Sequence, residues 1–440
     1  MRVTFAAFAR SSAAAAALVM GASLGTLATV TPASAKDAPK PTNSEQFSKV
    51  ASPFLKLFND VAGKKGKVPD DAFKTAASAL VPELVKVEAG VKNPLDRLIF
   101  GDWQRQVGGW ADNAALTNTG LQNMLDSGQL QPNQVNTVRA ILGQTAFGAN
   151  DYATVIKVLS PIAADPTADI AVPQWLGEAY AATGQPKLGL ETLKAAIAAR
   201  TTTAAPAPEE LYGRASRIAD GAKMYGESAE WSLLLVQAYP SPLKWLGAAQ
   251  RARLTTDNFS SQEELDISRL LDQTGALKLA AKDVSREYVV YLQSIDPRRY
   301  PGEALRIAEQ GIANGSLKAD DAFVKDALTQ AKARVAGDKA SLPSLVKDAN
   351  AAPTGKIALA AADAFLADGE AAQAATLYTL ALTKGGVDAD KDRLYTRLAI
   401  AQIALGAYAD AKANLAKVTG STALIARLWS VFADQKAAGK

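Results

Sequence analysis

Residues 175–196 decide the fold, and they read Trp175-Leu-Gly-Glu-Ala-Tyr-Ala-Ala-Thr-Gly-Gln-Pro-Lys-Leu-Gly-Leu-Glu-Thr-Leu-Lys-Ala-Ala196. Apolar residues recur at spacings of three and four on both sides of Gly184, which predicts two amphipathic helices joined by a turn. Gly184 falls where the first helix must end in a left-handed conformation, which glycine adopts without a Cβ penalty. Small residues let two helices approach closely, so we expect Gly177 to pack against Gly189.

Related segments recur along the chain at nearly constant intervals. Leu142-Gly143 precedes Leu176-Gly177 by 34 residues, and Trp245-Leu-Gly247 follows Trp175-Leu-Gly177 by 70. Residues 362–369 resemble residues 399–406 at an interval of 37. We therefore expect further turns at Gly369 and Gly406, and close contacts between residues 362 and 374 and between 399 and 411.

These intervals and the Leu-Gly-x-x-Tyr pattern resemble the tetratricopeptide repeat (TPR) family. The resemblance implies an all-α fold, a right-handed α-solenoid of stacked antiparallel helix hairpins. It covers about four recognisable copies, and the remaining copies are degenerate: Ala146 and Gln402 stand where the family has a large aromatic residue. The family binds its partners on the concave face, which is lined by the first helix of each hairpin.

The N-terminus has the pattern of a cleavable signal peptide. Arg2 and Arg10 are followed by an Ala-rich apolar stretch and by Ala33-Ser-Ala35, an A-x-A site that predicts cleavage after Ala35. An uncleaved anchor helix is the alternative. We expect a signal peptide at 1–35, a linker at 36–43, an N-terminal helical region at 44–130 and the TPR-like array at 131–440, possibly subdivided near 275–350. No other stretch is long and apolar enough to cross a bilayer.

Composition excludes several kinds of chemistry. The chain has 440 residues and contains neither cysteine nor histidine, which excludes Cys nucleophiles, disulfides, Ser-His-Asp triads and metal sites that need these ligands. A formal charge of +4 is too small and too diffuse to indicate nucleic-acid binding. We expect no cofactor, no metal and no enzymatic activity.

The remaining acid–base candidates fit helix starts better than active sites. Acidic pairs occur at 70–71, 209–210, 263–264 and 320–321, next to turn signals, where a negative charge stabilises a helix N-terminus. Gly226-Glu-Ser228 resembles a fragment of a lytic transglycosylase site, and we expect it to begin a helix instead. Ser344-Leu-Val-Lys347 matches an S-x-x-K pattern, but a helix that starts after Pro343 explains these residues better. We expect the preceding helix to end near Gly337.

Partner contacts are expected on the first helices of the repeats. The candidates are polar or charged residues outside the packing positions: Gln144, Gln174, Glu178, Lys356, Asp363, Arg393 and Arg397. A solvated helix face is the alternative for each of them. Their signs are mixed, so they predict no ligand of a single charge.

A second candidate patch surrounds the turn at Asp296-Pro297. Tyr291, Arg298, Arg299 and Tyr300 combine aromatic and cationic groups, which stack on sugar rings or anchor protein contacts. The alternative places the tyrosines in the core.

The sequence thus predicts a periplasmic or secreted, non-catalytic scaffold that binds a protein partner or an envelope complex. Two alternatives stay open: a protein that binds or cleaves glycan or peptidoglycan, and a structural or chaperone-like periplasmic factor. The oligomeric state and the identity of the partner are left open.

Overall fold

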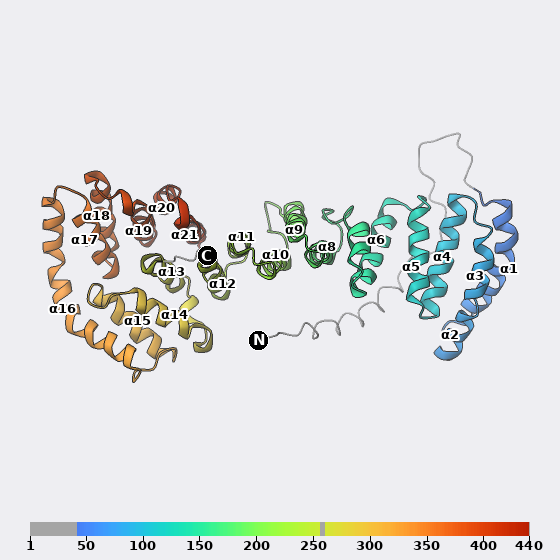
Figure 1. Cartoon of the computed structure of the whole chain (residues 1–440), viewed down its shortest axis with the longest axis horizontal. Helices are drawn as coiled ribbons and strands as arrows, with labels where there is room; N and C mark the ends of the chain where they lie inside the picture. The colour runs from blue at the N-terminus through green and yellow to red at the C-terminus, as the bar shows by residue number, and fades with distance from the viewer. Residues whose placement is uncertain (1–41, 256–259, 440) are drawn as a thin grey trace. The chain divides into compact units, whose positions relative to one another are not determined.

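A computed structural model describes residues 42–255 and 260–439, and these residues form helices and turns without a β-strand. The predicted signal peptide and nearly all of the predicted linker lie outside the described residues. The chain divides into two compact units, one ending at Ala199 and the other beginning at Arg200. Figure 1 shows both units as successive helices, which pack in hairpins within each unit. Each unit is therefore an α-solenoid of the TPR-like kind.

The helices of the N-terminal unit are α1 (Glu45–Ala62), α2 (Asp70–Ser78), α3 (Val81–Glu88), α4 (Pro94–Trp110), α5 (Ala114–Asp126), α6 (Pro132–Gly148), α7 (Tyr152–Leu159), α8 (Ala171–Ala182) and α9 (Pro186–Arg200). The predicted boundary after residue 130 falls between α5 and α6, inside this unit. Helices on both sides of it share one core, in which Leu98 and Met124 lie with Leu142 and Leu176.

The helices of the C-terminal unit are α10 (Glu209–Gly221), α11 (Tyr225–Ala238), α12 (Pro242–Ala252), α13 (Ser261–Gln273), α14 (Ala281–Ser294), α15 (Pro301–Ala313), α16 (Ala322–Ala351), α17 (Lys356–Ala367), α18 (Ala371–Lys384), α19 (Lys391–Ala404), α20 (Tyr408–Leu415) and α21 (Ala423–Ala437). Short 3-10 turns are η2 (Arg253–Thr255), η3 (Ala276–Lys278), η4 (Asp388–Asp390) and η5 (Gly420–Thr422).

The same type of turn joins the two helices in each of six hairpins. A residue with positive φ ends the first helix, and the next residue donates its N–H to the carbonyl five positions earlier, at 2.8–2.9 Å. The residues with positive φ are Asp112, Asn150, Gly184, Lys223, Gly369 and Gly406. The three predicted glycine turns are confirmed. Of the other three, Asp112 and Asn150 show that the repeat extends further toward the N-terminus than its glycines indicate, and Lys223 adds a turn between Gly184 and Gly369.

Exchanging residue types at this turn should change stability in opposite directions. Lys223→Gly is expected to raise the free energy of unfolding by about 0.5–1 kcal/mol, because it relieves a left-handed conformation at a residue with a Cβ. Gly184→Ala introduces that strain and should lower the free energy of unfolding by about 1 kcal/mol. Urea unfolding followed by circular dichroism measures both; equal signs for the two variants would contradict the shared turn.

Glycines bring helix backbones into direct contact in the N-terminal unit. A Cβ at Gly189 would lie 2.5 Å from the Gly177 carbonyl oxygen, which confirms the predicted contact. The α4–α5 pair is tighter still: a Cβ at Gly120 would lie 2.4 Å from both the Gly101 carbonyl oxygen and the Arg105 nitrogen. Because the obstructing atoms are backbone, neither helix accommodates a side chain without moving apart.

Gly120→Ala should therefore lower the free energy of unfolding by about 2–3 kcal/mol through overpacking. Gly109→Ala is the matched control, since a Cβ at this α4 position meets no atom within 4 Å. It should leave stability unchanged or raise it by up to about 1 kcal/mol, because alanine favours helix over glycine. Thermal unfolding of the two variants beside the parent checks this. A similar loss of stability in both variants would show that glycine is not required at residue 120 for the close approach of the helices.

Helix α16 contradicts one predicted break. It continues through Gly337 and Pro343, so residues 344–347 lie inside a helix and do not begin one. Its first half packs Ala331 into one core and its second half packs Leu342 into another, whereas residues 332–341 contribute no buried side chain. Packing at both ends outweighs the local helix-breaking signals. Lys384 Nζ closes the C-terminal end by donating to the carbonyls of residues 349, 350 and 352 at 2.6–2.9 Å.

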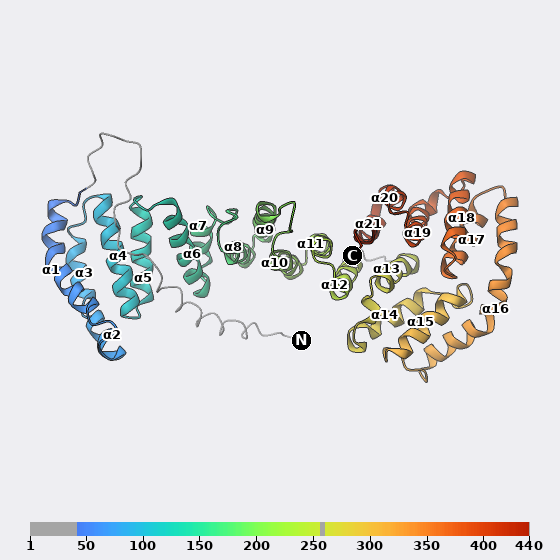
Figure 2. The ribbon, with the colours of Figure 1, turned by 180° about the vertical axis from the view of Figure 1, so that it is seen from behind.

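The C-terminal unit folds back on itself. Helix α13 contacts α14, α19 and α21, and every residue from 265 to 271 is buried, so neighbours surround this helix (Figures 1 and 2). Gln435 of α21 donates to the Val236 carbonyl of α11 at 2.8 Å, and Trp429 Nε1 donates to the Asp266 carbonyl at 3.2 Å. The last helices thus close against the first ones of the unit, whereas an open repeat array contacts only its nearest neighbours.

Candidate functional site

Five buried charged side chains meet in the interior of the C-terminal unit. We call this cluster the charged core, and its members are Asp266 and Arg269 of α13, Glu303 of α15, Asp363 of α17 and Arg397 of α19. Asp266 and Arg269 stand three residues apart in α13, within a buried stretch that also holds Leu265, Ile267, Leu270 and Leu271. They therefore point the same way, toward the helices that enclose α13.

Arg397 joins α13 to α17 and α19. Its Nε donates to Asp266 Oδ1 at 2.9 Å, and its Nη1 lies 3.0 Å from Asp363 Oδ1. Tyr378 Oη donates to the same Asp363 oxygen at 2.7 Å. The Arg397 and Asp363 side chains have no exposed surface at all, so their charges are balanced only by protein groups.

Arg269 makes the second buried ion pair. Its Nε and Nη2 donate to the two oxygens of Glu303 at 2.8 and 2.7 Å, a bidentate geometry that fixes both side chains. Tyr291 Oη donates to Glu303 Oε1 at 2.8 Å. The pair ties α13 to α15.

The electrostatics favour the charged forms of Glu303 and Arg397, whereas burial raises the pKa of the Asp266 carboxyl despite the charges of Arg397 and Arg269. Burial alone would raise the pKa of the Glu303 carboxyl, but the charge and hydrogen bonds of Arg269 hold it below its ordinary value. Burial would likewise lower the pKa of the Arg397 guanidinium, and the carboxylates of Asp266 and Asp363 hold it well above its ordinary value. Burial and then the charge of Asp363 raise the pKa of Tyr300 to about 12, so this phenol stays protonated.

The charged core carries three carboxylates and two guanidiniums, and Arg299 supplies a further cation. Arg299 Nη2 lies 3.8 Å from Asp363 Oδ2, and its guanidinium stacks over the Tyr300 ring at 5.1 Å. The acidic and basic groups of the charged core are thus engaged in contacts that link helices. What the arrangement does chemically is to hold four helices in fixed register.

Removing the central cation should destabilise the protein strongly. Arg397→Met leaves two buried carboxylates without their partner, and we expect a loss of about 3–5 kcal/mol in the free energy of unfolding. Arg427→Met is the matched control, because Arg427 pairs with Glu230 at the surface and both side chains are about half exposed. That pair should contribute at most about 1 kcal/mol. Urea unfolding of both variants measures the difference; a loss for Arg397→Met no larger than for the control would contradict the role of the charged core.

Four predicted partner-binding residues are buried: Asp363, Arg397, Tyr291 and Tyr300. The structure therefore contradicts the prediction that Asp363, Arg397 and Tyr300 present their side chains at the surface, whereas Tyr291 lines the cavity described below. Long-range ion pairs draw Asp363 and Arg397 inward, and the two tyrosines donate to buried carboxylates. Tyr300 and Tyr291 are thus core residues, the alternative considered above, and neither offers a ring face for a sugar.

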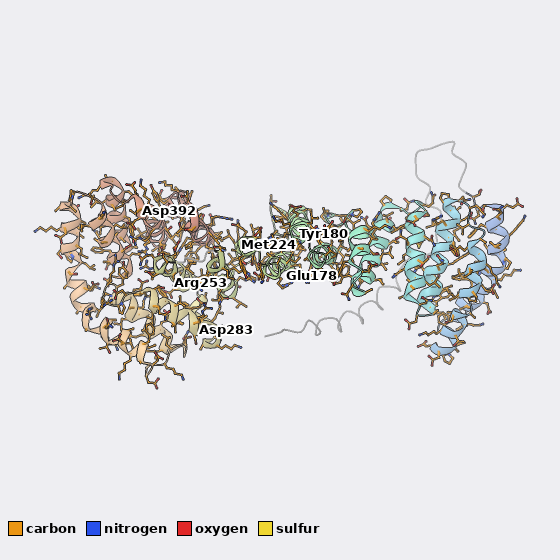
Figure 3. All side chains as sticks on the ribbon, in the orientation of Figure 1. Glu178, Tyr180, Met224, Arg253, Asp283 and Asp392 are labelled. Carbon is orange, nitrogen blue, oxygen red and sulfur yellow. The ribbon has the colours of Figure 1, made fainter. Side chains whose placement is uncertain are left out.

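The other predicted residues lie at or near the surface, in both units. Gln144 of α6 and Lys356 of α17 are exposed, and so are Arg298 and Arg299 in the turn before α15. Arg298 Nε donates to Asp296 Oδ1 at 3.0 Å. The half-buried residues are Gln174 and Glu178 of α8 and Arg393 of α19. Figure 3 labels Glu178 together with Tyr180 on α8.

The structure also confirms that the acidic pairs and Glu227 lie at helix starts. All four acidic pairs lie at helix N-termini, three in the first turn of α2, α10 and α13 and the fourth at the start of α16, where Asp321 is the N-cap. Glu227 lies in the first turn of α11, as expected. Within the described ranges no helix is long and apolar enough to span a membrane, and no three acidic side chains are grouped to hold a metal ion.

A cavity of about 370 Å³, partly open to solvent, lies beside the charged core. Its lining combines the polar side chains of Arg269, Tyr291 and Glu303 with the apolar side chains of Ile400 and Ile403. Such mixed, preformed hollows are typical binding sites. Sequence reasoning missed both features. The one available signal was the charged Asp266 and Arg269 inside the apolar run Leu265–Leu271, where a buried pair is expected.

No family model matches the chain, and no curated protein matches its sequence. Similar solved structures include the TPR2AB domain of yeast Sti1 in a complex with pHSP90, at 15% identity over 70% of this chain and 98% of that chain, with a TM-score of 0.22. The TPR domain of P58(IPK) is 14% identical over 81% of this chain and 94% of that chain (TM-score 0.24). Naa15/Naa10 bound to HypK-THB gives 13% identity over 84% and 67%, with a TM-score of 0.24. At these TM-scores the likeness does not extend to the whole arrangement of helices, and the TPR-like character rests on the hairpin turns and glycine contacts described above.

Proposed function

We propose that the chain is a non-catalytic, TPR-like scaffold that binds a protein partner and is exported to the periplasm or secreted. The observation that carries this proposal is that the charged groups of the buried cluster and of the acidic pairs have structural roles. The buried acids and bases are paired with one another, and the paired acids on the surface begin helices. What is left for function is surface and cavity, and both suit binding.

Export rests on the sequence alone. The basic start, the apolar stretch and the A-x-A site at Ala33–Ala35 form a signal peptide pattern. A chain without cysteine folds in an oxidising compartment without mispaired disulfides.

The first helices of the N-terminal hairpins are the proposed contact surface. On α6, Ile141 is 37% exposed and Gln144, one turn further, is exposed as well. An apolar side chain beside an amide offers both burial and hydrogen bonding to a partner. The glycan alternative has less support, because the aromatic rings on which it depended are buried.

The test is affinity capture of the tagged, full-length mature chain from cross-linked cells, followed by mass spectrometry. We expect one enriched protein, and we expect Ile141→Arg combined with Gln144→Arg to reduce its capture at least about tenfold, as loss of a central contact does. Ala153→Arg is the matched control on α7, the second helix of the same hairpin, where Ala153 is exposed. It should leave capture unchanged.

Three outcomes would contradict the proposal. Equal capture of the partner by the α6 and α7 variants would show that the partner does not contact α6. Recovery of many unfolded clients in place of one partner would favour the chaperone-like alternative. A cleared band in a cell-wall zymogram would show an enzyme.

A further inference from the structure

The cavity beside the charged core reaches from the surface into the interior of the C-terminal unit. The exposed members of its lining are Gln273, Arg306, Gly369 and Ala404. The buried members include Tyr291, Glu303, Ile400, Ile403 and Trp429. A ligand can therefore enter between the exposed residues and come to rest against the buried ones.

The cavity is too large to be a packing defect. Its volume is about 370 Å³, whereas protein interiors hold few voids larger than a water molecule, whose share of liquid volume is about 30 Å³. Sites for small molecules have volumes of about 300–1,000 Å³, and this cavity falls in that range. Since an apolar cavity of about 150 Å³ accepts one benzene molecule, there is room here for roughly two to three rings. One aromatic side chain of a protein would fill less than half of the space.

The guanidiniums of the lining are already paired with carboxylates. Arg269 Nε and Nη2 donate to both oxygens of Glu303, and Arg306 Nη1 donates to Asp272 Oδ2 at 2.8 Å. Each guanidinium of the lining thus has a carboxylate partner that belongs to the lining as well. An anion that entered the cavity would have to compete with these carboxylates.

The remaining charged residue of the lining is Asp368. Lys339 Nζ lies 3.9 Å from its Oδ2, and this oxygen is buried, so it presents no surface to a ligand. A charged group brought into the cavity would lose its hydration without gaining a free partner of opposite charge, which is costly. The lining therefore disfavours charged ligands of either sign.

The polar hydrogens of the two buried aromatic residues are engaged as well. Tyr291 Oη donates to Glu303 Oε1 at 2.8 Å, and Trp429 Nε1 donates to the Asp266 carbonyl at 3.2 Å. The apolar side chains of the lining are Leu366, Ala367, Ala371, Ile400, Ile403 and Ala404. What the interior of the cavity offers a ligand is thus chiefly apolar contact.

We propose that this cavity binds an uncharged, largely apolar small molecule of about two to three rings, or an aliphatic compound of similar volume. Its body lies against Ile400 and Ile403, and its outer end lies near Gln273 and Ala404. The site goes beyond the proposed function, because it is a small-molecule site in the C-terminal unit, whereas the proposed protein contact lies on α6 of the N-terminal unit.

The probe is N-phenyl-1-naphthylamine, a neutral dye whose fluorescence rises in apolar surroundings, titrated into the full-length chain without its predicted signal peptide. Its matched control is 8-anilino-1-naphthalenesulfonate, which has the same rings and one added negative charge. We expect saturable binding of one neutral dye per chain. The sulfonate should bind at least about tenfold more weakly, because its charge would be desolvated without a free cation.

Two variants place the dye in the cavity. Ala404→Trp adds bulk at an exposed position of the lining, and Ala371→Leu narrows the lining from α18. Each should weaken binding of the neutral dye at least about tenfold. Ala413→Trp is the matched control, since Ala413 is an exposed residue of α20 outside the lining, and it should leave binding unchanged. Circular dichroism confirms that each variant is folded.

A competition experiment separates a small molecule from a side chain of a protein. The pentapeptide Ala-Ala-Trp-Ala-Ala carries the same kind of uncharged ring system and should not displace the dye at tenfold its concentration. Displacement by the peptide would overturn a small molecule as the ligand.

The absence of saturable binding of the neutral dye would also overturn the proposal. Equal affinity for the neutral dye and the sulfonate would overturn the selection against charge. Undiminished binding by both Ala404→Trp and Ala371→Leu, or an equal loss in Ala413→Trp, would show that the dye does not occupy this cavity.

Discussion

The ion pairs of Arg397 with Asp266 and Asp363 are the interaction on which the C-terminal unit depends. Arg397 and Asp266 are 131 residues apart in sequence, and all three side chains are buried. Desolvating such charges is costly, so this cluster is not the cheapest way to fill a core. Its effect is specificity: a carboxylate at position 266 and a carboxylate at 363 accept one guanidinium only if α13, α17 and α19 meet in a single register.

The same constraint accounts for the cavity. The wall formed by α13 and α15 must keep Arg269 and Glu303 in bidentate contact, so it cannot supply the interdigitating apolar side chains that would fill the space opposite Ile400 and Ile403. The lining of the cavity therefore combines charged and apolar side chains. Closing the repeat array creates a hollow that stacked neighbours alone would not leave.

The sequence predicted the local parts of this fold well. Gly184, Gly369 and Gly406 end helices as expected, because the left-handed turn has a direct sequence signal in glycine. The same turn at Asp112 and Lys223 has no such signal, and packing of the flanking helices imposes it there. Helical periodicity identified the helices of Asp363 and Arg397 but placed these residues on the solvated face. Their partners lie on other helices, and Asp266 is 131 residues from Arg397, so the pairing leaves no trace in the local pattern.

The helices inside each unit are thus held together by different contacts in the two units. In the N-terminal unit, backbones touch at Gly101 and Gly120 and at Gly177 and Gly189, and specificity comes from the absence of side chains. In the C-terminal unit, a close contact of Gly355 with the Ala381 carbonyl is joined by long side chains whose charges match in only one arrangement. Glycine contacts join helices that are neighbours in sequence, so they build an extendable stack with a continuous helical surface. Charge matching joins helices that are distant in sequence, so it closes the stack and encloses a site. One repeat architecture thus supplies an open helical surface and an enclosed cavity, because its two units differ in what fills the space between helices.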